Sequence, residues 1–319
     1  MRELPGDLGS DLLTVRDWLR YATSLFTREK LAFGQGVTCA FDEAVWLVCH
    51  TLSLPRESWE TFLDARLAAA EKTALQAILR RRAFDREPAA YITGEAWLGD
   101  LSFRVDKRVV IPRSYFLEVI PEQLNQWLRD PTAVAHAADV CTGSGCLAIL
   151  LARAYPDALV DATDISADAL EVAAQNIADY ALEERVTPHR ADVLTGVPPP
   201  PAGYDIIVCN PPYEPETLAE TLPAEFRREP QNGLFSGADG MDVIRKLLPQ
   251  AAAHLADAGV LLVETGGLRE TLETEFPKLE INWLTTDDAS DCIALFHASA
   301  LRETFPPKSR QSRRPAATA

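Results

Sequence analysis

The first quarter of the chain has the hydrophobic spacing of amphipathic helices. Apolar side chains recur there at intervals of three and four residues, between positions 11 and 85. This spacing predicts three helices, near residues 12–26, 44–52 and 69–84. The third carries Arg80, Arg81 and Arg82 in its last turns, where cations complement the helix dipole, and we interpret all three as solvated. Pro88 is expected to keep this helix from continuing.

Alternation of apolar and polar residues replaces the helical spacing between residues 97 and 111. Leu101, Phe103 and Val105, followed by the apolar run 109–111, predict two strands that meet in a turn at Asp106–Lys107. A further helix is expected over about residues 115–129. These patterns predict a helical domain over residues 1–94 and a linker, made of a β-hairpin and a helix, over residues 95–130.

From about residue 133, segments with strand and helix patterns follow one another. Strands are predicted at 134–140, 158–163, 205–209 and 259–264, with helices at 146–154 and 167–180. Such alternation is typical of an α/β fold with a mostly parallel, Rossmann-like sheet. Two further strands, 281–285 and 292–297, are expected to form an antiparallel pair. The α/β domain should span residues 131–300, and the proline-containing, basic tail 301–319 is expected to be disordered.

Composition narrows the class of protein. The chain has 319 residues, 47% of them hydrophobic, which is enough for about two domains with buried cores. It has no signal-peptide pattern and no apolar run long enough to span a bilayer, so we expect a cytoplasmic protein without a membrane partner. The six cysteines form no CxxC pair and have no His cluster beside them, which indicates reduced thiols and no metal site. The net charge of −16 disfavours nucleic acid as a partner and suits a basic one.

A nucleotide site is predicted where the first strand of the α/β domain turns into a helix. Glycines in the segment Asp139–Gly145 would let a ligand approach the backbone, and Asp164 ends the next strand, where a carboxylate can accept ribose hydroxyls. The alternative role of Asp164 is a helix N-cap, but Ser166 can fill that role. The GxGxxG spacing of dinucleotide sites is missing, and a carboxylate at position 139 suits a positively charged ligand. We therefore predict S-adenosylmethionine rather than NAD, bound by Asp139, Cys141, Thr142, Gly143, Gly145, Asp164, Ile165, Asp192 and Asn210.

The sharpest signal is the sequence Asn-Pro-Pro-Tyr at residues 210–213, directly after a predicted strand. An amide or amino nitrogen conjugated with a π system is a poor nucleophile, and two hydrogen-bond acceptors can orient it. The Asn210 side-chain oxygen and the Pro211 carbonyl would be those acceptors, and Tyr213 would face the planar group. The alternative is a plain Asn-Pro turn with Tyr213 in the core. We predict catalytic roles for Asn210, Pro211 and Tyr213 and substrate binding by Asn210, Pro211, Pro212, Tyr213 and Arg113.

Several of these segments together resemble one family, the protein glutamine-N5 methyltransferases of the HemK type, over about residues 12–298. The shared segments are 91–94 (YITG), 110–113 (VIPR), 139–143, Asp164, 210–213 and 264–266 (ETG). The resemblance implies that the turn at 139–143 binds the methionine part of S-adenosylmethionine, that Asp164 binds its ribose, and that residues 210–213 bind the glutamine. It also implies that the helical domain helps to recognise a protein substrate.

Within this family the chain is most similar to the branch that modifies large-subunit ribosomal protein three, a basic ribosomal protein. The segments 139–146 (DVCTGSGC), 41–44 (FDEA) and 228–240 carry that similarity. The chain departs from the branch at 115–117 and at 289–294, where a glycine-rich segment is replaced and the last turn is expected to differ in shape. Three alternatives stay open: methylation of release factors, methylation of an exocyclic amino group of adenine or cytosine, and a silent sensor of S-adenosylmethionine. The sequence gives no indication of an oligomeric state.

Overall fold

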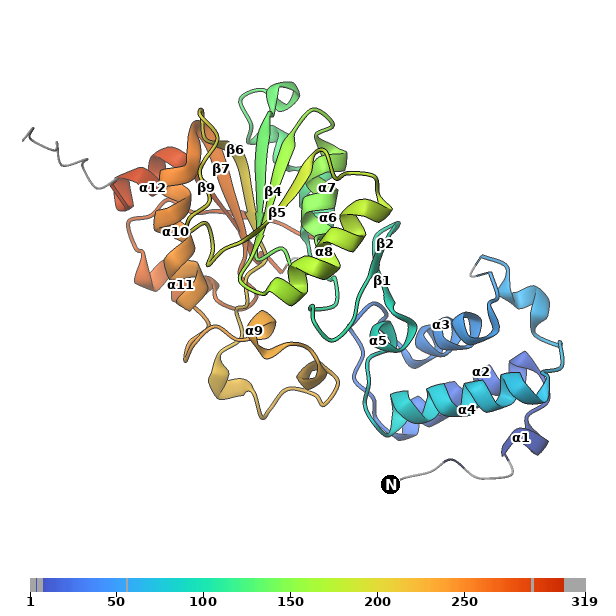
Figure 1. The fold of residues 1–319 in the computed structure, drawn as a ribbon. Helices are drawn as coiled ribbons and strands as arrows, with labels where there is room; N and C mark the ends of the chain where they lie inside the picture. Colours follow the sequence, from blue (N-terminus) through green and yellow to red (C-terminus); the bar gives the residue numbers. More distant parts are fainter. Residues whose placement is uncertain (1–3, 5–7, 56, 288–289, 307–319) are drawn as a thin grey trace, which may run out of the picture.

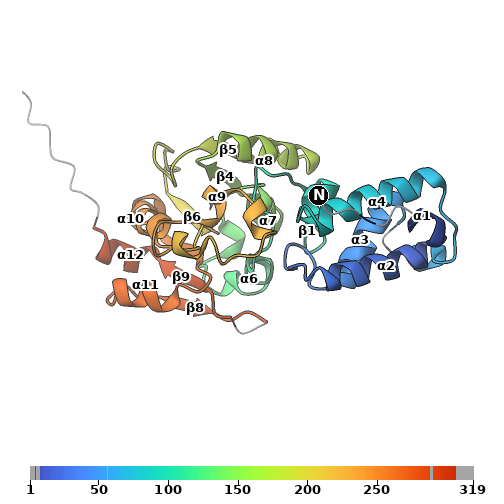
Figure 2. The ribbon, with the colours of Figure 1, turned by 90° about the horizontal axis from the view of Figure 1, so that it is seen from below.

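The chain forms a small helical body joined to a larger α/β body (Figure 1). A computed structural model describes residue 4 and residues 8–55, 57–287 and 290–306. The hairpin and the segment that follows it lie between the two bodies, and a second view separates them clearly (Figure 2). This arrangement confirms the predicted Rossmann-like α/β fold with an N-terminal helical region.

Among the described residues, the helical body contains the three predicted helices, with three shorter ones beside them. They are α1 (Leu8–Asp11), α2 (Val15–Arg28), α3 (Ala40–Leu52), the 3-10 helix η1 (Trp59–Phe62), α4 (Ala69–Ala83) and α5 (Ala89–Thr93). Helix α2 begins later than its hydrophobic pattern because Thr14 caps it. The Thr14 N–H donates to Asp17 over 2.9 Å, and the Asp17 N–H donates to the Thr14 hydroxyl.

Arg82, at the end of α4, contradicts the interpretation of the three arginines as solvated. Its side chain is only 1% exposed, and it forms ion pairs with Glu43 at 2.6 Å and with Glu225 at 3.4 Å. Arg80 and Arg81 are partly exposed and pair locally, with Asp85 and Glu87. A buried guanidinium requires such partners, because an unpaired charge in the protein interior is strongly unfavourable.

The predicted hairpin exists, but its turn lies elsewhere in the sequence. Strands β1 (Glu95–Leu98) and β2 (Leu101–Arg104) pair antiparallel around Gly99, whose φ of +59° suits a tight turn. A turn does begin at Asp106, where the Val109 N–H donates to the Asp106 carbonyl over 3.1 Å, but it joins no pair of strands among the described residues, so the prediction that two strands meet there was wrong. The following helix α6 (Phe116–Glu122) contains Pro121 and is shorter than expected; the 3-10 helices η2 (Leu124–Gln126) and η3 (Pro131–Ala133) come next.

The α/β body is built on a seven-stranded sheet in the order β5-β4-β3-β6-β7-β9-β8. The strands are β3 (His136–Val140), β4 (Leu159–Asp164), β5 (Val186–Arg190), β6 (Tyr204–Cys209), β7 (Leu255–Glu264), β8 (Asn282–Leu284) and β9 (Ile293–His297). The sheet is parallel except for β9, which pairs antiparallel with β7 and β8, as predicted for the last two strands. Residues 288–289, within the connection between β8 and β9 where the chain departs from the ribosomal branch, lie outside the described residues.

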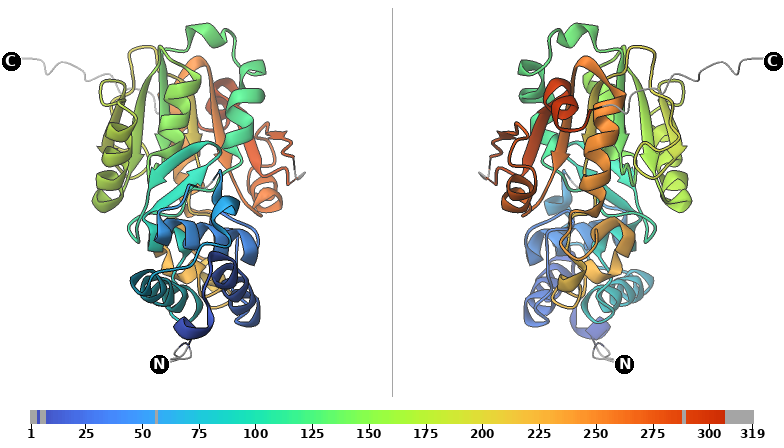
Figure 3. Two further views of the ribbon diagram at one scale, coloured as in Figure 1. Left: turned by 90° about the vertical axis from the view of Figure 1, so that its right-hand side faces the viewer. Right: turned by 90° about the vertical axis from the view of Figure 1, so that its left-hand side faces the viewer.

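Helices cover both faces of this sheet (Figure 3). Helices α6, α7 (Cys146–Ala154) and α8 (Ala167–Asp179) pack on one face, in a core that includes Phe116, Ile149 and Ile177. Helices α10 (Asp242–His254), α11 (Arg269–Glu275) and α12 (Ala298–Thr304) pack on the other. Between β6 and α10 the chain also forms η4 (Glu216–Leu218), η5 (Phe226–Arg228) and α9 (Gln231–Leu234), below the sheet in Figure 1.

The prediction that residues 301–319 are disordered was wrong for the first of these residues, because helix α12 extends to Thr304. Leu301 is fully buried, and Arg302 donates to the Leu255 carbonyl and pairs with Asp257 at 2.8 Å. Residues 307–319 lie outside the described residues. Among the residues that the structure does describe, no helix is both long and apolar enough to cross a membrane.

Candidate functional site

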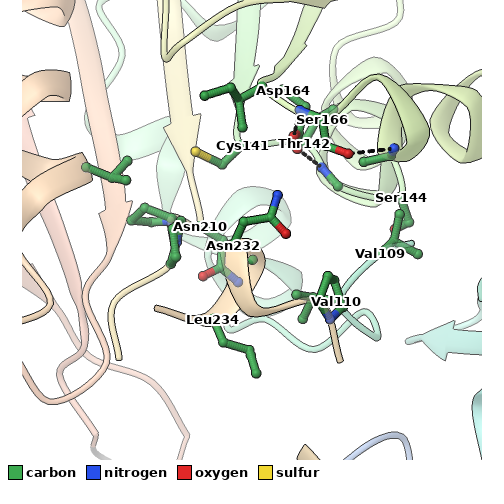
Figure 4. A pocket seen from close by; sticks show the side chains of 18 of the residues that line it. Val109, Val110, Cys141, Thr142, Ser144, Asp164, Ser166, Asn210, Asn232 and Leu234 are labelled. Atoms are coloured by element: carbon green, nitrogen blue, oxygen red, sulfur yellow. Dashed lines mark hydrogen bonds between the residues drawn. The ribbon is translucent and has the colours of Figure 1, made fainter. Parts of the chain in front are cut away.

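A cavity of about 570 Å³ opens at the carboxyl ends of β3, β4 and β6. This is the position where open α/β sheets bind ligands. The wall residues come from the segments 108–114, 141–147, 163–169, 191–193, 210–214 and 222–235, with Val243 and Lys246. We call residues 222–235 the cover segment. Figure 4 shows that side chains from the sheet turns, from the linker and from the cover segment surround one space.

The turn after β3 forms one side of this cavity, where the predicted cofactor residue Gly143 lines it and the predicted residue Gly145 does not. Gly145 has a φ of +82°, and a Cβ there would lie 3.2 Å from the Cβ of Ala173, so the start of α7 packs closely on α8. Asp164 accepts hydrogen bonds from the N–H groups of Gly143 and Ser166, each over 2.9 Å. Burial raises the pKa of Asp164. Each of its two oxygens keeps a second lone pair for a ligand.

Four other predicted cofactor residues on this side also line the cavity, and one of them has a partner that was not foreseen. Cys141 and Thr142 belong to the turn after β3, and Ile165, beside Asp164, is 55% exposed. Ser166 caps α8 by accepting the Ala169 N–H, as expected. Asp192 lies at the far end of this wall and pairs with Lys246 at 2.9 Å, a partner that the sequence did not predict.

Asp139 lies behind the turn and does not line the cavity. Its side chain is completely buried, and one carboxylate oxygen accepts hydrogen bonds from the Thr142 hydroxyl and the Ala148 N–H. The other oxygen, Oδ1, has no hydrogen-bond partner among the described residues. Burial raises the pKa of Asp139 to about 7. Direct contact with a ligand in the cavity, as predicted for Asp139, therefore finds no support in this geometry, whereas a role in holding the turn does.

Burial of Asp139 predicts an unusual pH dependence of stability. A carboxyl whose pKa rises from 3.8 to about 7 on folding binds more protons in the folded state, so stability is lost as pH rises through this window. Glu264, whose pKa burial also raises to about 7, acts in the same direction. We expect Asp139→Asn to weaken this dependence by an amount on the order of a few kcal/mol. Urea unfolding of ligand-free wild type and Asp139→Asn at about pH 5 and about pH 8 measures this dependence. An equal change in the free energy of unfolding between the two pH values in both proteins would contradict the prediction.

The predicted acceptor-side residues form the opposite part of the cavity. Asn210 follows β6 directly, and its amide nitrogen donates to the Arg113 carbonyl over 3.4 Å. Its oxygen accepts no hydrogen bond from the described residues, so the side chain presents an acceptor. Pro211 and Pro212 are buried and have no N–H to offer. This part of the cavity therefore presents hydrogen-bond acceptors from the segment 210–212.

Tyr213 is held in place by glycines that the sequence analysis did not explain. A Cβ on Gly266 would lie 2.7 Å from two ring carbons of Tyr213, and one on Gly240 would lie 2.3 Å from its carbonyl oxygen. Both glycines have positive φ values, +53° and +85°. Burial, and the nearby carboxylate of Glu264, raise the pKa of Tyr213. The segment 264–266 thus packs against the ring of Tyr213.

Gly266→Ala should displace the Tyr213 ring, because the added methyl group overlaps it and left-handed φ is unfavourable for alanine. We expect the predicted methyl-transfer activity to fall by about tenfold or more, with a smaller loss of cofactor affinity, since the turn after β3 is untouched. Gly267→Ala is the matched control, because a Cβ at Gly267 meets no atom within 4 Å. Equal activity of the two variants would contradict this account of Tyr213.

Arg113 does not present a free guanidinium to the cavity. It pairs with Glu229 at 2.9 Å and lies over the Phe226 ring, 5.2 Å from its centroid. The Glu229 side chain is completely buried and also accepts the Ile111 N–H. Arg113 therefore joins the linker to the cover segment, and its predicted contact with substrate could involve only the part of the side chain that lines the cavity. The segment 228–230, noted only as a family feature, contains the missed partner.

Among the described residues, no group of three or more His, Cys, Asp or Glu side chains is arranged to hold a metal ion.

Comparisons with known proteins agree with this architecture. The family model described as Methyltransferase small domain matches residues 121–282, and the one described as PrmC N-terminal domain matches residues 17–94. The chain is 48% identical over 285 residues to the ribosomal protein uL3 glutamine methyltransferase of Bordetella pertussis, which covers 89% of this chain and 95% of the relative. The proteins of the same name from Burkholderia pseudomallei (48% identity, 90% and 95% covered) and Neisseria meningitidis serogroup B (46%, 89% and 93% covered) are similar to it as well.

Proposed function

Because the chain belongs to the family of ribosomal protein uL3 glutamine methyltransferases, we propose that it methylates a glutamine side-chain nitrogen of uL3 with S-adenosylmethionine as the methyl donor. The observation that carries the proposal is the acceptor geometry at Asn210. Its amide nitrogen is engaged by the Arg113 carbonyl, which leaves the side-chain oxygen for the N–H of a bound amide.

The cavity residues fit S-adenosylmethionine, which when bound supplies a methyl group on a positively charged sulfur. Asp164 would accept the ribose hydroxyls with its remaining lone pairs, and Ile165 would pack against the adenine. The unpartnered, buried Oδ1 of Asp139 puts a carboxylate behind the turn, where it favours a cationic ligand at longer range. Asp192 would accept a hydrogen bond from the adenine amino group, either in place of its ion pair with Lys246 or in addition to it.

The residues on the acceptor side orient a weak nucleophile. An amide nitrogen reacts only when its lone pair is turned away from conjugation with the carbonyl. The Asn210 oxygen and the Pro211 carbonyl would each accept one N–H of the glutamine, which fixes the nitrogen and favours charge that develops on it. The buried prolines stiffen this segment and add no competing donor. Tyr213 would present its ring to the planar amide, and the extra proton leaves the nitrogen after transfer.

Charge and domain organisation support a basic protein as substrate. The net charge of −16 would attract a strongly basic partner and raise the encounter rate at low salt. We propose that the helical region of residues 1–94 recognises this protein and that the α/β region of residues 131–300 carries the chemistry. The modified segment must be extended to reach Asn210, so the free or partly assembled protein is the substrate, in the cytoplasm.

A transfer assay with labelled S-adenosylmethionine tests this proposal against its alternatives. Purified uL3, a peptide chain release factor and ribosomal RNA are offered to the enzyme separately. We expect label on uL3 and at most slow transfer to the other two. Label on the release factor alone would move the assignment to the sister branch, and label on RNA alone would refute glutamine methylation.

A further inference from the structure

The helical domain does not touch the cavity, yet it is anchored to one of the cavity's walls. Among the described residues, every one that lines the cavity lies at or after Arg108. Any influence of the helical domain on the site must therefore pass through residues that contact both. The cover segment has this position, with Leu222, Pro223, Phe226 and Pro230 on the cavity.

The first anchor is a buried cluster of charges around Glu225. Its side chain is 2% exposed and pairs with Arg86 at 3.0 Å and with Arg82 at 3.4 Å. Arg82 also binds Glu43 of α3 and the Ala32 carbonyl, both within the helical domain. Two carboxylates and two guanidiniums thus compensate one another across the domain boundary, which favours one relative position of the two parts.

The second anchor is Glu229. The side-chain amide of Gln35 donates to one of its oxygens, and Arg113 and the Ile111 N–H bind the carboxylate from the linker. A third contact lies between the anchors, where the Arg228 guanidinium donates to the Asp85 carbonyl. Residues 225–229 therefore contact the helical domain at several points, while Phe226, within the same five residues, lines the cavity.

We infer that the helical domain positions the acceptor-side wall of the cavity through Glu225 and Glu229, so that these two are positioning residues for the glutamine substrate. The inference rests on the proposed function for the identity of that substrate. The cofactor wall is built from the turns after β3 and β4, which the anchors do not contact. Loosening the anchors should therefore impair use of the protein substrate and leave cofactor binding unchanged.

Glu225→Gln tests this, with Glu220→Gln as the matched control. Glu220 lies in the loop before the cover segment, is exposed, and does not line the cavity, so its replacement removes the same charge without an anchor. We expect Glu225→Gln to raise the KM for uL3 by about tenfold, with the Kd for S-adenosylmethionine within about twofold of wild type. The KM of Glu225→Asp, which keeps the charge, should lie between those of wild type and Glu225→Gln. Glu220→Gln should change KM far less.

Hydrogen–deuterium exchange supplies a readout that needs no substrate. Glu225→Gln should speed exchange in residues 222–235 and leave residues 139–166 as in wild type. If Glu225→Gln folds poorly, Gln35→Leu removes the bond to Glu229 without changing a charge and should give the same pattern. The inference would be overturned if Glu225→Gln left both the exchange rates and the KM for uL3 unchanged. It would also be overturned if exchange became equally faster in residues 222–235 and 139–166 and the affinity for S-adenosylmethionine fell as well. If the wild-type enzyme transferred no methyl group to uL3, the proposed function would be refuted. Faster exchange confined to residues 222–235 in Glu225→Gln would in that case still support the coupling between the helical domain and the cavity wall.

Discussion

Replacing Asn210 with alanine should lower the single-turnover rate of methyl transfer by about a hundredfold or more, while the affinity for S-adenosylmethionine stays within a few-fold. The reason is that the Asn210 oxygen is one of two acceptors that orient the glutamine nitrogen. The Arg113 carbonyl fixes the side chain beforehand, so the oxygen needs no reorganisation when the substrate binds. Rapid-quench measurement with saturating uL3 and cofactor separates this rate from binding.

Asn210→Asp is the informative companion to the alanine variant. It keeps two acceptor oxygens but replaces the donor that binds the Arg113 carbonyl, so the carboxylate is repelled from that carbonyl and turned away from its orientation. We expect a rate between those of wild type and Asn210→Ala. A near wild-type rate for Asn210→Ala, with calorimetry showing intact cofactor binding, would exclude Asn210 as the residue that orients the acceptor.

Asp164→Ala should weaken binding of S-adenosylmethionine by about 1.5–3 kcal/mol, the range for hydrogen bonds to a charged group. This corresponds to roughly a 10- to 150-fold rise in Kd. Part of the loss comes from the turn itself, because the Gly143 and Ser166 N–H groups lose their acceptor. Titration calorimetry of the folded variant measures the effect.

Asp192→Ala is the contrast for Asp164. The Asp192 side chain is 44% exposed and already paired with Lys246, so solvent and the lysine compensate for much of any bond to the adenine. We expect its Kd to rise by only a few-fold. If Asp192→Ala weakened binding as much as Asp164→Ala, the assignment of the ribose to Asp164 would have to be abandoned.

Local patterns in the sequence predicted most of the helices and strands of the α/β domain. The strands β3, β4, β6 and β7 and the helices α7 and α8 appeared at or within a few residues of their predicted bounds, because buried parallel strands and amphipathic helices have distinct spacings. The hairpin turn was misplaced by about seven residues, since Gly99 and Asp106–Lys107 both signal a turn and only the one at Gly99 joins two paired strands among the described residues.

Contacts between distant residues account for what the sequence could not show. Arg82 is buried because Glu225, 143 positions away, meets it across the domain boundary, and no local pattern contains that partner. Arg113 was predicted as a substrate residue, but Glu229 engages its guanidinium. Asp139 was recognised from its motif, whereas its depth behind the cavity wall depends on how α7 packs against the sheet. The roles of the individual cavity residues stay predictions that the variants above test.

The central claim is that this enzyme methylates a glutamine of uL3, and the mass of uL3 from living cells tests it most directly. Intact-protein and peptide mass spectrometry should compare ribosomal proteins from cells with and without the gene. We predict that uL3 alone loses the mass of one methyl group, on a glutamine-containing peptide, and that the wild-type gene restores it while Asn210→Ala does not. A uL3 mass that is the same with and without the gene would contradict the account.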